Sequence, residues 1–374
     1  ILRQIVHNAA SATDNTSSAI VTVPSCYDQT HRRFVVDACR IAGIDLVQLL
    51  DKPLAGVLSW QEVNSHLSHN RSNAVNQRLL FVHLGGTGLE ASIVQITGTK
   101  VRQLGCHGSW KHGSLRWQQL LAEYFVGVLK EQTGCSIRED VAAATRLQRS
   151  VELALDRLTR TPKVEVRFEW NGASLQQTIT QQGLVRIAPD MVRELQNSIS
   201  MAVENSGIDV SDIDHILVAG SMMRIKPIRE IVDATIPHHP RITVLDKADF
   251  ARGAAVQARH LTLLTRGEQE EVLHATGSCP YDFGILASGD SRLGKPRILV
   301  DKTTELPHTC TRTLRPQAAP AESSQAESSQ ADTGDASSPR FPTFHIIEST
   351  ALGGANWHML GQASPEELFP QRVG

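Results

Sequence analysis

One segment of the chain joins a strand to a glycine-rich turn, a pattern that can bind a phosphate group. In FVHLGGTGLEASI, residues 81–93, a hydrophobic strand leads into the turn and the chain then returns to apolar residues. The turn consists of Gly85, Gly86, Thr87 and Gly88. Glycine allows backbone N–H groups to surround an anion, and a threonine can add a hydroxyl group. A metal-dependent site would also need a carboxylate at the end of the strand, but that residue is His83.

A second strand that ends in a glycine turn occurs later, in HILVAGS, residues 215–221. Gly220 and Ser221 form this turn, and Arg224 follows it closely. Two such units within an α/β pattern are typical of a protein that holds a phosphorylated ligand in a cleft. The sequence therefore predicts a ligand cleft with both turns beside it.

The elements that must position these turns alternate between strand and helix. Strands are expected at 19–23 and 46–50; between them we expect a helix that Asp28 caps and Gly43 ends. Pro53 opens a second helix, and RLLFVHLGG, EASIVQIT and KVRQLGC form a hairpin of strands. Further along, we expect amphipathic helices at 114–132 and 139–158, followed by a small antiparallel sheet from VEVRFEW and QQTITQQGLVRI. Three more helices are expected: one at 189–206, one that begins at about Pro227, and one at 248–264.

The composition is that of an ordinary globular protein, and it excludes several classes of function. Of the 374 residues, 41% are apolar and 20% are charged, and the formal net charge is −2. This balance gives no overall attraction to nucleic acid or to an acidic membrane surface. No apolar run is long enough to cross a bilayer. The six cysteines lie far apart without a Cys-x-x-Cys pair, which favours reduced thiols in a cytoplasmic protein.

The two ends of the chain differ from its centre. ILRQIVHNAA, residues 1–10, has helical periodicity without a preceding cap, and we interpret the sequence as a fragment that lacks upstream elements. Residues 265–315 indicate a linker followed by the short strands YDFGILA, PRILVDK and CTRTL. Segment 317–340, which repeats AESSQ, is expected to be disordered, and strand character resumes at 341–348.

Five stretches, in consistent order over about residues 1–315, resemble the seventy-kilodalton heat-shock chaperones of the DnaK type. AIVTVPSCYDQT…LLDKPLAG is similar to the first-lobe strand, turn and helix of that family, and LLFVHLGGTGLEASI is similar to its Asp-Leu-Gly-Gly-Gly-Thr phosphate loop. HILVAGSMMRIKPIREIV resembles the adenosine segment, and DFARGAAVQARHL resembles the last helix of the nucleotide-binding domain. CPYDFGI with TTELPHTCTRTL resembles the first strands of the peptide-binding sandwich.

The resemblance implies a fold and a domain order. The fold class is α/β, with an actin-like (ribonuclease-H-like) ATPase domain that lacks its N-terminal part, followed by an incomplete β-sandwich. We expect a partial nucleotide-binding domain at 1–264, a linker at 265–275, a partial peptide-binding β-domain at 276–361 with its disordered insert, and a tail at 362–374. Within the first domain, the expected parts are a first-lobe remnant at 1–78, a second-lobe core at 79–113 and 189–264, and a second-lobe insertion at 114–188.

The resemblance also assigns nucleotide-binding residues: Gly85, Gly86, Thr87, Gly88, Glu152, Gly220, Ser221 and Arg224. Three departures matter. His83 aligns with the family's magnesium-linked aspartate, and Lys52 aligns with its catalytic glutamate, so the pocket becomes about three charge units more positive. Leu155 and Asp156 replace the cations that flank the base. We therefore assign no catalytic or metal-binding residue, expect weakened binding of ATP or ADP, and regard magnesium as a doubtful cofactor.

Three functional classes remain open from the sequence. The first is a DnaK-type chaperone homologue impaired in ATP hydrolysis, whose implied partners are unfolded client polypeptides and J-domain co-chaperones. The second is an inactive protein-interaction scaffold. The third is another actin-fold protein, such as a sugar kinase or a filament protein; a linker and strands after GAAVQARHL disfavour this class.

Overall fold

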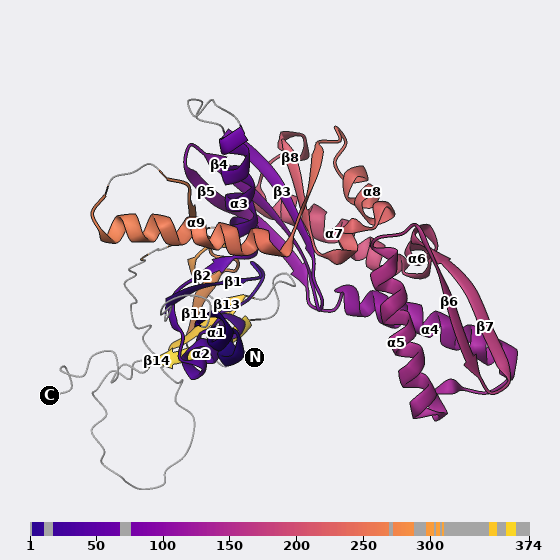
Figure 1. The fold of residues 1–374 in the computed structure, drawn as a ribbon. Helices are drawn as coiled ribbons and strands as arrows, with labels where there is room; N and C mark the ends of the chain where they lie inside the picture. Colours follow the sequence, from indigo (N-terminus) through magenta and orange to yellow (C-terminus); the bar gives the residue numbers. More distant parts are fainter. Residues whose placement is uncertain are drawn as a thin grey trace, which may run out of the picture.

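The structure is a computed structural model. It describes residues 2–10, 18–67, 76–268, 272–287, 297–302, 304–306, 309, 344–349 and 357–363. Figure 1 shows a body built around a mixed sheet, an arm of helices and a two-stranded sheet that extends from it, and a group of N-terminal and C-terminal elements that lie together beneath the body.

The central sheet places both glycine turns at the same edge. Its strands are β3 (Asn76–Leu84), β4 (Leu89–Thr97), β5 (Lys100–Ser109), β8 (His215–Ala219), β9 (Arg241–Leu245) and β10 (His274–Thr276), in the order β10-β5-β4-β3-β8-β9. The strands β3, β4 and β5 are antiparallel, whereas β8 runs parallel to β3 and pairs His83 with Ala219. Because parallel neighbours end at the same edge, the turns that follow β3 and β8 lie side by side.

Helices cover both faces of this sheet. Alternate residues of β3 point to opposite faces, and Leu79, Leu80, Phe81 and Val82 are all completely buried. On one face, α3 (Lys52–Leu67) and α9 (Lys247–Thr265) pack over Leu79 and Phe81. On the other face, α7 (Pro189–Ser206) and α8 (Lys226–Ala234) pack over Leu80 and Val82. A strand buried on both sides explains the continuous apolar run LLFV.

The arm consists of α4 (Ser114–Thr133), α5 (Val141–Leu158), β6 (Lys163–Trp170), β7 (Ala173–Thr180) and α6 (Gln181–Ile187) (Figure 1). Both predicted helices are confirmed, but the prediction that QQTITQQGLVRI is a strand throughout was wrong. The strand ends at Thr180, whose hydroxyl accepts a hydrogen bond of 2.9 Å from the N–H of Gly183 and so caps α6. A threonine that fits a strand also fits a helix cap, and this residue does both.

The N-terminal elements agree with the sequence. They are α1 (Leu2–Ala10), β1 (Ser18–Val23), α2 (Gln29–Ala42) and β2 (Asp45–Asp51), with β1 and β2 parallel. The Asp28 carboxylate accepts a hydrogen bond of 2.8 Å from the N–H of His31, and Gly43 ends the helix with a φ of 77°. The predicted start and end of α2 are therefore confirmed.

The C-terminal strands form a separate antiparallel sheet. Its members are β11 (Phe283–Ala287), β12 (Arg297–Val300), β13 (Phe344–Ser349) and β14 (Trp357–Ala363), in the order β12-β11-β13-β14. This sheet contacts the N-terminal elements through Glu348 of β13, which accepts from the N–H of Gln29 at 3.0 Å; just before β11, the Tyr281 hydroxyl donates to the Cys26 carbonyl at 2.5 Å. The expected strand CTRTL and the insert 317–340 lie outside the described residues.

Three described strands were missing from the sequence prediction. The segment RITVL forms β9, which pairs in parallel with β8. His274–Thr276 forms β10 inside the expected linker and pairs in parallel with β5. Trp357–Ala363 forms β14. Each is short or lacks clear alternation, so its strand character depends on the neighbour with which it pairs.

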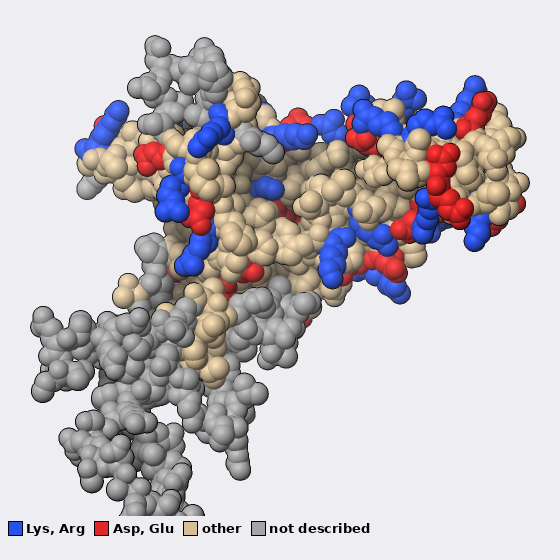
Figure 2. Space-filling model, turned by 90° about the horizontal axis from the view of Figure 1, so that it is seen from below, with Lys and Arg blue, Asp and Glu red and all other residues tan. Residues whose placement is uncertain are grey.

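The surface carries charges of both signs. On the face shown in Figure 2, Lys and Arg side chains lie among Asp and Glu side chains over the body and the arm. Within the described ranges, no helix is long and apolar enough to cross a membrane. The described cysteines Cys26, Cys39, Cys106, Cys135 and Cys279 are free thiols.

Glu348 provides a pH-dependent contact between the C-terminal sheet and α2. Glu348 is completely buried, and one of its carboxylate oxygens accepts a hydrogen bond of 3.0 Å from the N–H of Gln29. Burial, with a smaller contribution from the neighbouring Asp28 carboxylate, raises the pKa of Glu348 from 4.5 to about 7. Between these two pH values the folded state holds a proton that the unfolded chain has lost. The contribution of Glu348 to the free energy of unfolding is therefore fully present below about pH 4.5, and it is lost as the pH rises through about 7.

We expect this effect to reach about 3 kcal/mol at most, at 1.36 kcal/mol for each pKa unit. Urea unfolding at mildly acidic and mildly alkaline pH measures it. Because the histidines also titrate in this range, the control is Glu348→Gln, which keeps a hydrogen-bond acceptor and cannot ionise. The variant is expected to lose less stability than the wild type as the pH rises. Identical pH profiles for the two proteins would show that Glu348 does not carry the effect.

Candidate functional site

The turn between β3 and β4 is closed by its own backbone. The N–H of Gly85 donates a hydrogen bond of 2.8 Å to the carbonyl of Gly88. The N–H groups of Gly86, Thr87 and Gly88 have no hydrogen-bond acceptor within the described part of the chain, and all three residues line a cavity. Adjacent free N–H groups in a turn can bind an anion. The turn can therefore hold a phosphate group.

The start of α4 fixes the shape of this turn. The N–H groups of Ser114 and Leu115 donate to the carbonyls of Gly85 and Gly86, at 2.8 and 3.0 Å. The first N–H groups of a helix have no partner within the helix, and here the turn supplies their acceptors. At Gly113, a Cβ atom would lie 2.3 Å from the Gly86 carbonyl oxygen. Glycine is required there because the two backbones are in direct contact.

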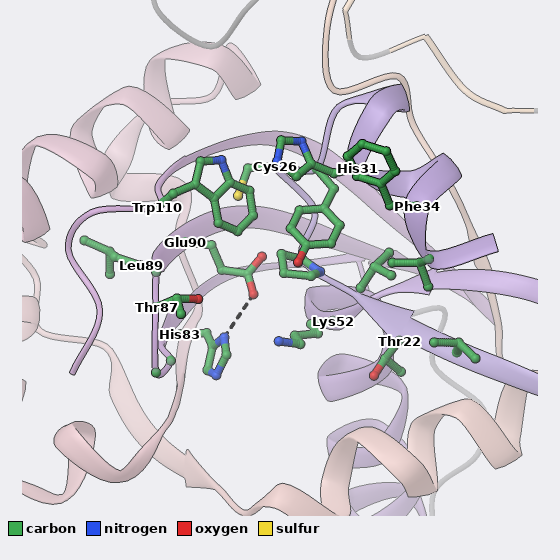
Figure 3. Close-up of a pocket in the computed structure, with 18 of the residues that line it drawn as sticks. Thr22, Cys26, His31, Phe34, Lys52, His83, Thr87, Leu89, Glu90 and Trp110 are labelled. Carbon is green, nitrogen blue, oxygen red and sulfur yellow. Dashed lines mark hydrogen bonds and ion pairs between the residues drawn. The ribbon is translucent and has the colours of Figure 1, made fainter. Parts of the chain in front are cut away.

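A cavity of about 650 Å³ extends from the turn to the N-terminal elements. Its wall includes the end of β1, the first turns of α2, the start of α3 and Trp110, which follows β5 (Figure 3). Small-molecule sites in proteins commonly have volumes of about 300–1,000 Å³. The cavity is therefore large enough for a phosphorylated ligand of nucleotide size.

Glu90 is the only acidic residue among the described residues that line the cavity, and both of its oxygens are occupied. It is 2% exposed. One oxygen lies 3.1 Å from His83 Nδ1 (Figure 3), and the other accepts hydrogen bonds from the N–H of Ser25 at 2.9 Å and from its hydroxyl at 3.2 Å. Both oxygens of this carboxylate therefore already have partners within the protein.

Asp51 and Lys52 are neighbours in the chain, but their side chains lie in different environments. Asp51 ends β2, is buried, and forms an ion pair with Arg32 at 2.6 Å. Lys52 begins α3 and is the only Lys or Arg among the described residues of the cavity wall. Figure 3 shows its side chain extending toward His83. The lysine side chain therefore lines the cavity, whereas the aspartate side chain is buried in an ion pair outside it.

The second glycine turn packs against the first but does not line the cavity. Gly220 has a φ of 102°, and a Cβ atom there would lie 2.0 Å from the carbonyl oxygen of Leu84. Ser221 and Arg224 form a short 3-10 turn, and Arg224 is ion-paired with Asp246 at 2.6 Å on the surface. Neither residue is part of the described cavity wall.

Glu152 lies on the exposed side of α5 and is ion-paired with Arg149 at 2.6 Å. It is outside the described cavity wall as well. Leu155 packs into the core of the arm with 7% exposure, and Asp156 is ion-paired with Arg160. The structure thus brings Gly85, Gly86, Thr87 and Gly88 to the cavity and leaves Glu152, Ser221 and Arg224 in surface positions.

Sequence reasoning missed a group of aromatic side chains in the cavity wall. Tyr27 and His31 come from the start of the α2 region, and Trp110 follows β5. Burial raises the pKa of the Tyr27 hydroxyl, and the nearby Cys26 and Glu90 raise it further. No spacing in the sequence could reveal this group, because its members lie about eighty residues apart and meet only in the folded chain.

Within the described ranges, no group of three or more His, Cys, Asp and Glu side chains is arranged to hold a metal ion. A comparison with protein families gives a match to the model of the Hsp70 protein over residues 1–304. The matched range contains the cavity wall and both glycine turns, and it ends in the C-terminal sheet.

Proposed function

Because the chain belongs to the Hsp70 protein family, we propose that it is a chaperone-family protein that binds the phosphates of ATP or ADP without magnesium and does not hydrolyse ATP at a useful rate. The family has an actin-like ATPase fold and binds ATP and ADP. One observation carries the proposal: Lys52 and His83, neither of which is an acid, face the cavity, while its only described acid, Glu90, is engaged by the protein.

Phosphate binding would use the groups that the turn leaves free. The N–H groups of Gly86, Thr87 and Gly88 can donate to phosphate oxygens, and the Lys52 ammonium can neutralise their charge. Hydrogen bonds to ionised groups are about twice as strong as those between neutral groups. Lys52 thus neutralises the negative charge of the phosphates, as a metal cation does in metal-dependent sites.

The cavity does not fit magnesium. This ion requires near-octahedral oxygen ligands, and it is commonly bound through one or two carboxylates. The described wall offers one carboxylate, which already accepts hydrogen bonds from Ser25 and lies beside His83. Imidazole and ammonium groups are poor replacements for oxygen ligands.

Hydrolysis also needs a group that orients or activates water. Phosphoryl transfer depends on positioned cations and on a residue that places the nucleophile. Asp51 is the acid next to the position of the family's glutamate, but it is buried in an ion pair with Arg32. No described acid is therefore free in the cavity to perform this step.

The partners and domains follow the family. We propose unfolded client polypeptides and J-domain proteins as partners, a cytoplasmic location, and a peptide-binding role for the sheet of β11 to β14. We also propose the division into residues 1–264 and 276–361; the end of α9 at Thr265 and the start of β11 at Phe283 support it, whereas β10 at His274–Thr276 still pairs with the central sheet. The family match sets aside a sugar kinase or filament protein. A scaffold that binds no nucleotide is the remaining alternative.

Calorimetric titration of the protein with ATP and with ADP, in excess EDTA and in excess magnesium, tests the proposal. We expect the same affinity in both buffers and no phosphate release from ATP above the buffer control, with or without a J-domain protein. Loss of affinity on chelation, or turnover of ATP, would show that the proposal is wrong. If neither buffer shows binding, the protein is a scaffold.

A further inference from the structure

Three aromatic side chains form a continuous wall on one side of the cavity; we call Tyr27, His31 and Trp110 the aromatic wall. The ring centroids of Tyr27 and Trp110 are 4.7 Å apart, and those of His31 and Trp110 are 5.6 Å apart with an angle of 18° between the planes. Tyr27 and His31 stack at 5.2 Å. Figure 3 shows His31 and Trp110 above Glu90, with Thr87, His83 and Lys52 below it.

The aromatic wall is held in place by polar contacts and by packing. His31 Nδ1 lies 2.7 Å from an oxygen of Asp28, the residue that also caps α2. Tyr27 packs against the rings of both His31 and Trp110, which also stack on each other. Trp110 nevertheless keeps 39% of its surface exposed. A rigid, partly open aromatic surface of this kind suits stacking with a planar ring.

The phosphate-binding turn is directly next to this wall. A Cβ atom at Gly88 would lie 3.3 Å from Trp110 Cε3, so the indole touches the turn. Gly86, Thr87, Gly88 and Lys52 line the same cavity as the three rings. Anion-binding groups and a stacking surface therefore face one enclosed space.

The residues expected to hold the base are paired with other side chains in this structure. Arg224 is ion-paired with Asp246, Glu152 is ion-paired with Arg149, and neither residue belongs to the described cavity wall. Leu155 is directed into the core of the arm. A ligand whose phosphates lie on the turn would meet aromatic rings on the other side of the cavity.

We propose that the cavity binds a nucleoside phosphate with its base stacked on the aromatic wall and its phosphates on the Gly86–Gly88 turn and Lys52. The base then points away from Glu152 and Arg224. This inference rests on the proposed function, because it assumes that the turn holds phosphate, and it adds the orientation of the ligand and the residues that select it.

Selectivity follows from the chemistry of the wall. Every base has a π-face, so stacking tolerates different bases and is strongest for large rings. His31 Nδ1 is already engaged by Asp28 and does not read the edge of a base. ADP and GDP are therefore expected to bind with similar affinity, and both more tightly than inorganic pyrophosphate.

The test uses calorimetry of the whole chain in EDTA, with ADP and with inorganic pyrophosphate as ligands. Stacking of one base contributes about 1–3 kcal/mol by alanine substitution, so Trp110→Leu is expected to weaken ADP binding about ten-fold. Pyrophosphate binding should stay unchanged in this variant, because the turn and Lys52 remain. Trp110→Phe keeps an aromatic ring and should recover most of the ADP affinity, and thermal unfolding checks that both variants fold.

The possible failures can be told apart. If the wild type binds neither ADP nor pyrophosphate, the proposed function fails. If it binds both with equal affinity, or if Trp110→Leu weakens both equally, phosphate binding stands and base stacking on the aromatic wall is wrong. If Arg224→Ala weakens ADP binding and Trp110→Leu does not, the base lies on the Arg224 side and the proposed orientation is reversed.

Discussion

Replacement of Lys52 by Glu together with His83 by Asp is expected to make ATP binding depend on magnesium. In EDTA the affinity of this double variant should fall about a hundred-fold or more. The change adds about three negative charge units to the cavity wall, and one unit charge at about 4 Å corresponds to about 4 kcal/mol at an effective dielectric constant of 20. Excess magnesium should restore much of the affinity, since two carboxylates then face the phosphates and can hold the ion.

Calorimetry with ATP in EDTA and in magnesium measures both affinities. The control is Lys163→Glu, a charge reversal on the exposed side of β6, which tests for a general effect of net charge. This control should bind ATP as the wild type does in either buffer. A double variant that keeps its affinity in EDTA would show that neither Lys52 nor His83 contacts the phosphates.

The second large effect is expected from Gly253→Ala at the contact between α9 and α3. A Cβ atom at Gly253 would lie 1.8 Å from the Ala55 carbonyl oxygen and 2.5 Å from its carbonyl carbon. Both neighbours are backbone atoms of a buried helix, so the two helices must separate. We expect the free energy of unfolding to fall by about 3 kcal/mol. Because Ala55 is in the first turn of α3, Lys52 should move and phosphate affinity should fall as well.

Urea unfolding measures this loss, and Gly127→Ala in α4 is the matched control. Gly127 is exposed within a helix, and a Cβ atom there would meet no atom within 4 Å. Alanine is the better helix former by about 0.5–1 kcal/mol, so the control should be slightly more stable than the wild type. Equal stabilities for Gly253→Ala and Gly127→Ala would contradict the close contact between the helices.

Several elements could be predicted because their signals are local. Asp28 and Gly43 bound α2 as expected, since a cap and a left-handed glycine act within one helical turn. The buried run LLFV and the turn after it were equally clear. In contrast, QQGLVRI forms α6 although it was predicted as part of an antiparallel sheet, and β9 depends on pairing with β8. Such outcomes are set by neighbours that are distant in the sequence.

The candidate site divides in the same way. Gly85, Gly86, Thr87 and Gly88 were identified from the sequence, and the structure places them in the cavity wall. The assignment of Glu152, Ser221 and Arg224 by resemblance remains a prediction; the structure places these residues at the surface, two of them in ion pairs. These ion pairs are contacts of the folded chain, so the sequence motifs did not indicate them.

The sequence by itself determined that a glycine turn follows a buried strand and that a lysine and a histidine stand where a metal-dependent site needs acids. These properties belong to single residues and short segments, so they can be read without a fold. Only the tertiary structure decided that both oxygens of Glu90 are occupied and that Tyr27, His31 and Trp110 form a wall beside the turn. Such contacts join segments far apart in the chain, and they exist only because folding of the sheet and its helices brings them together.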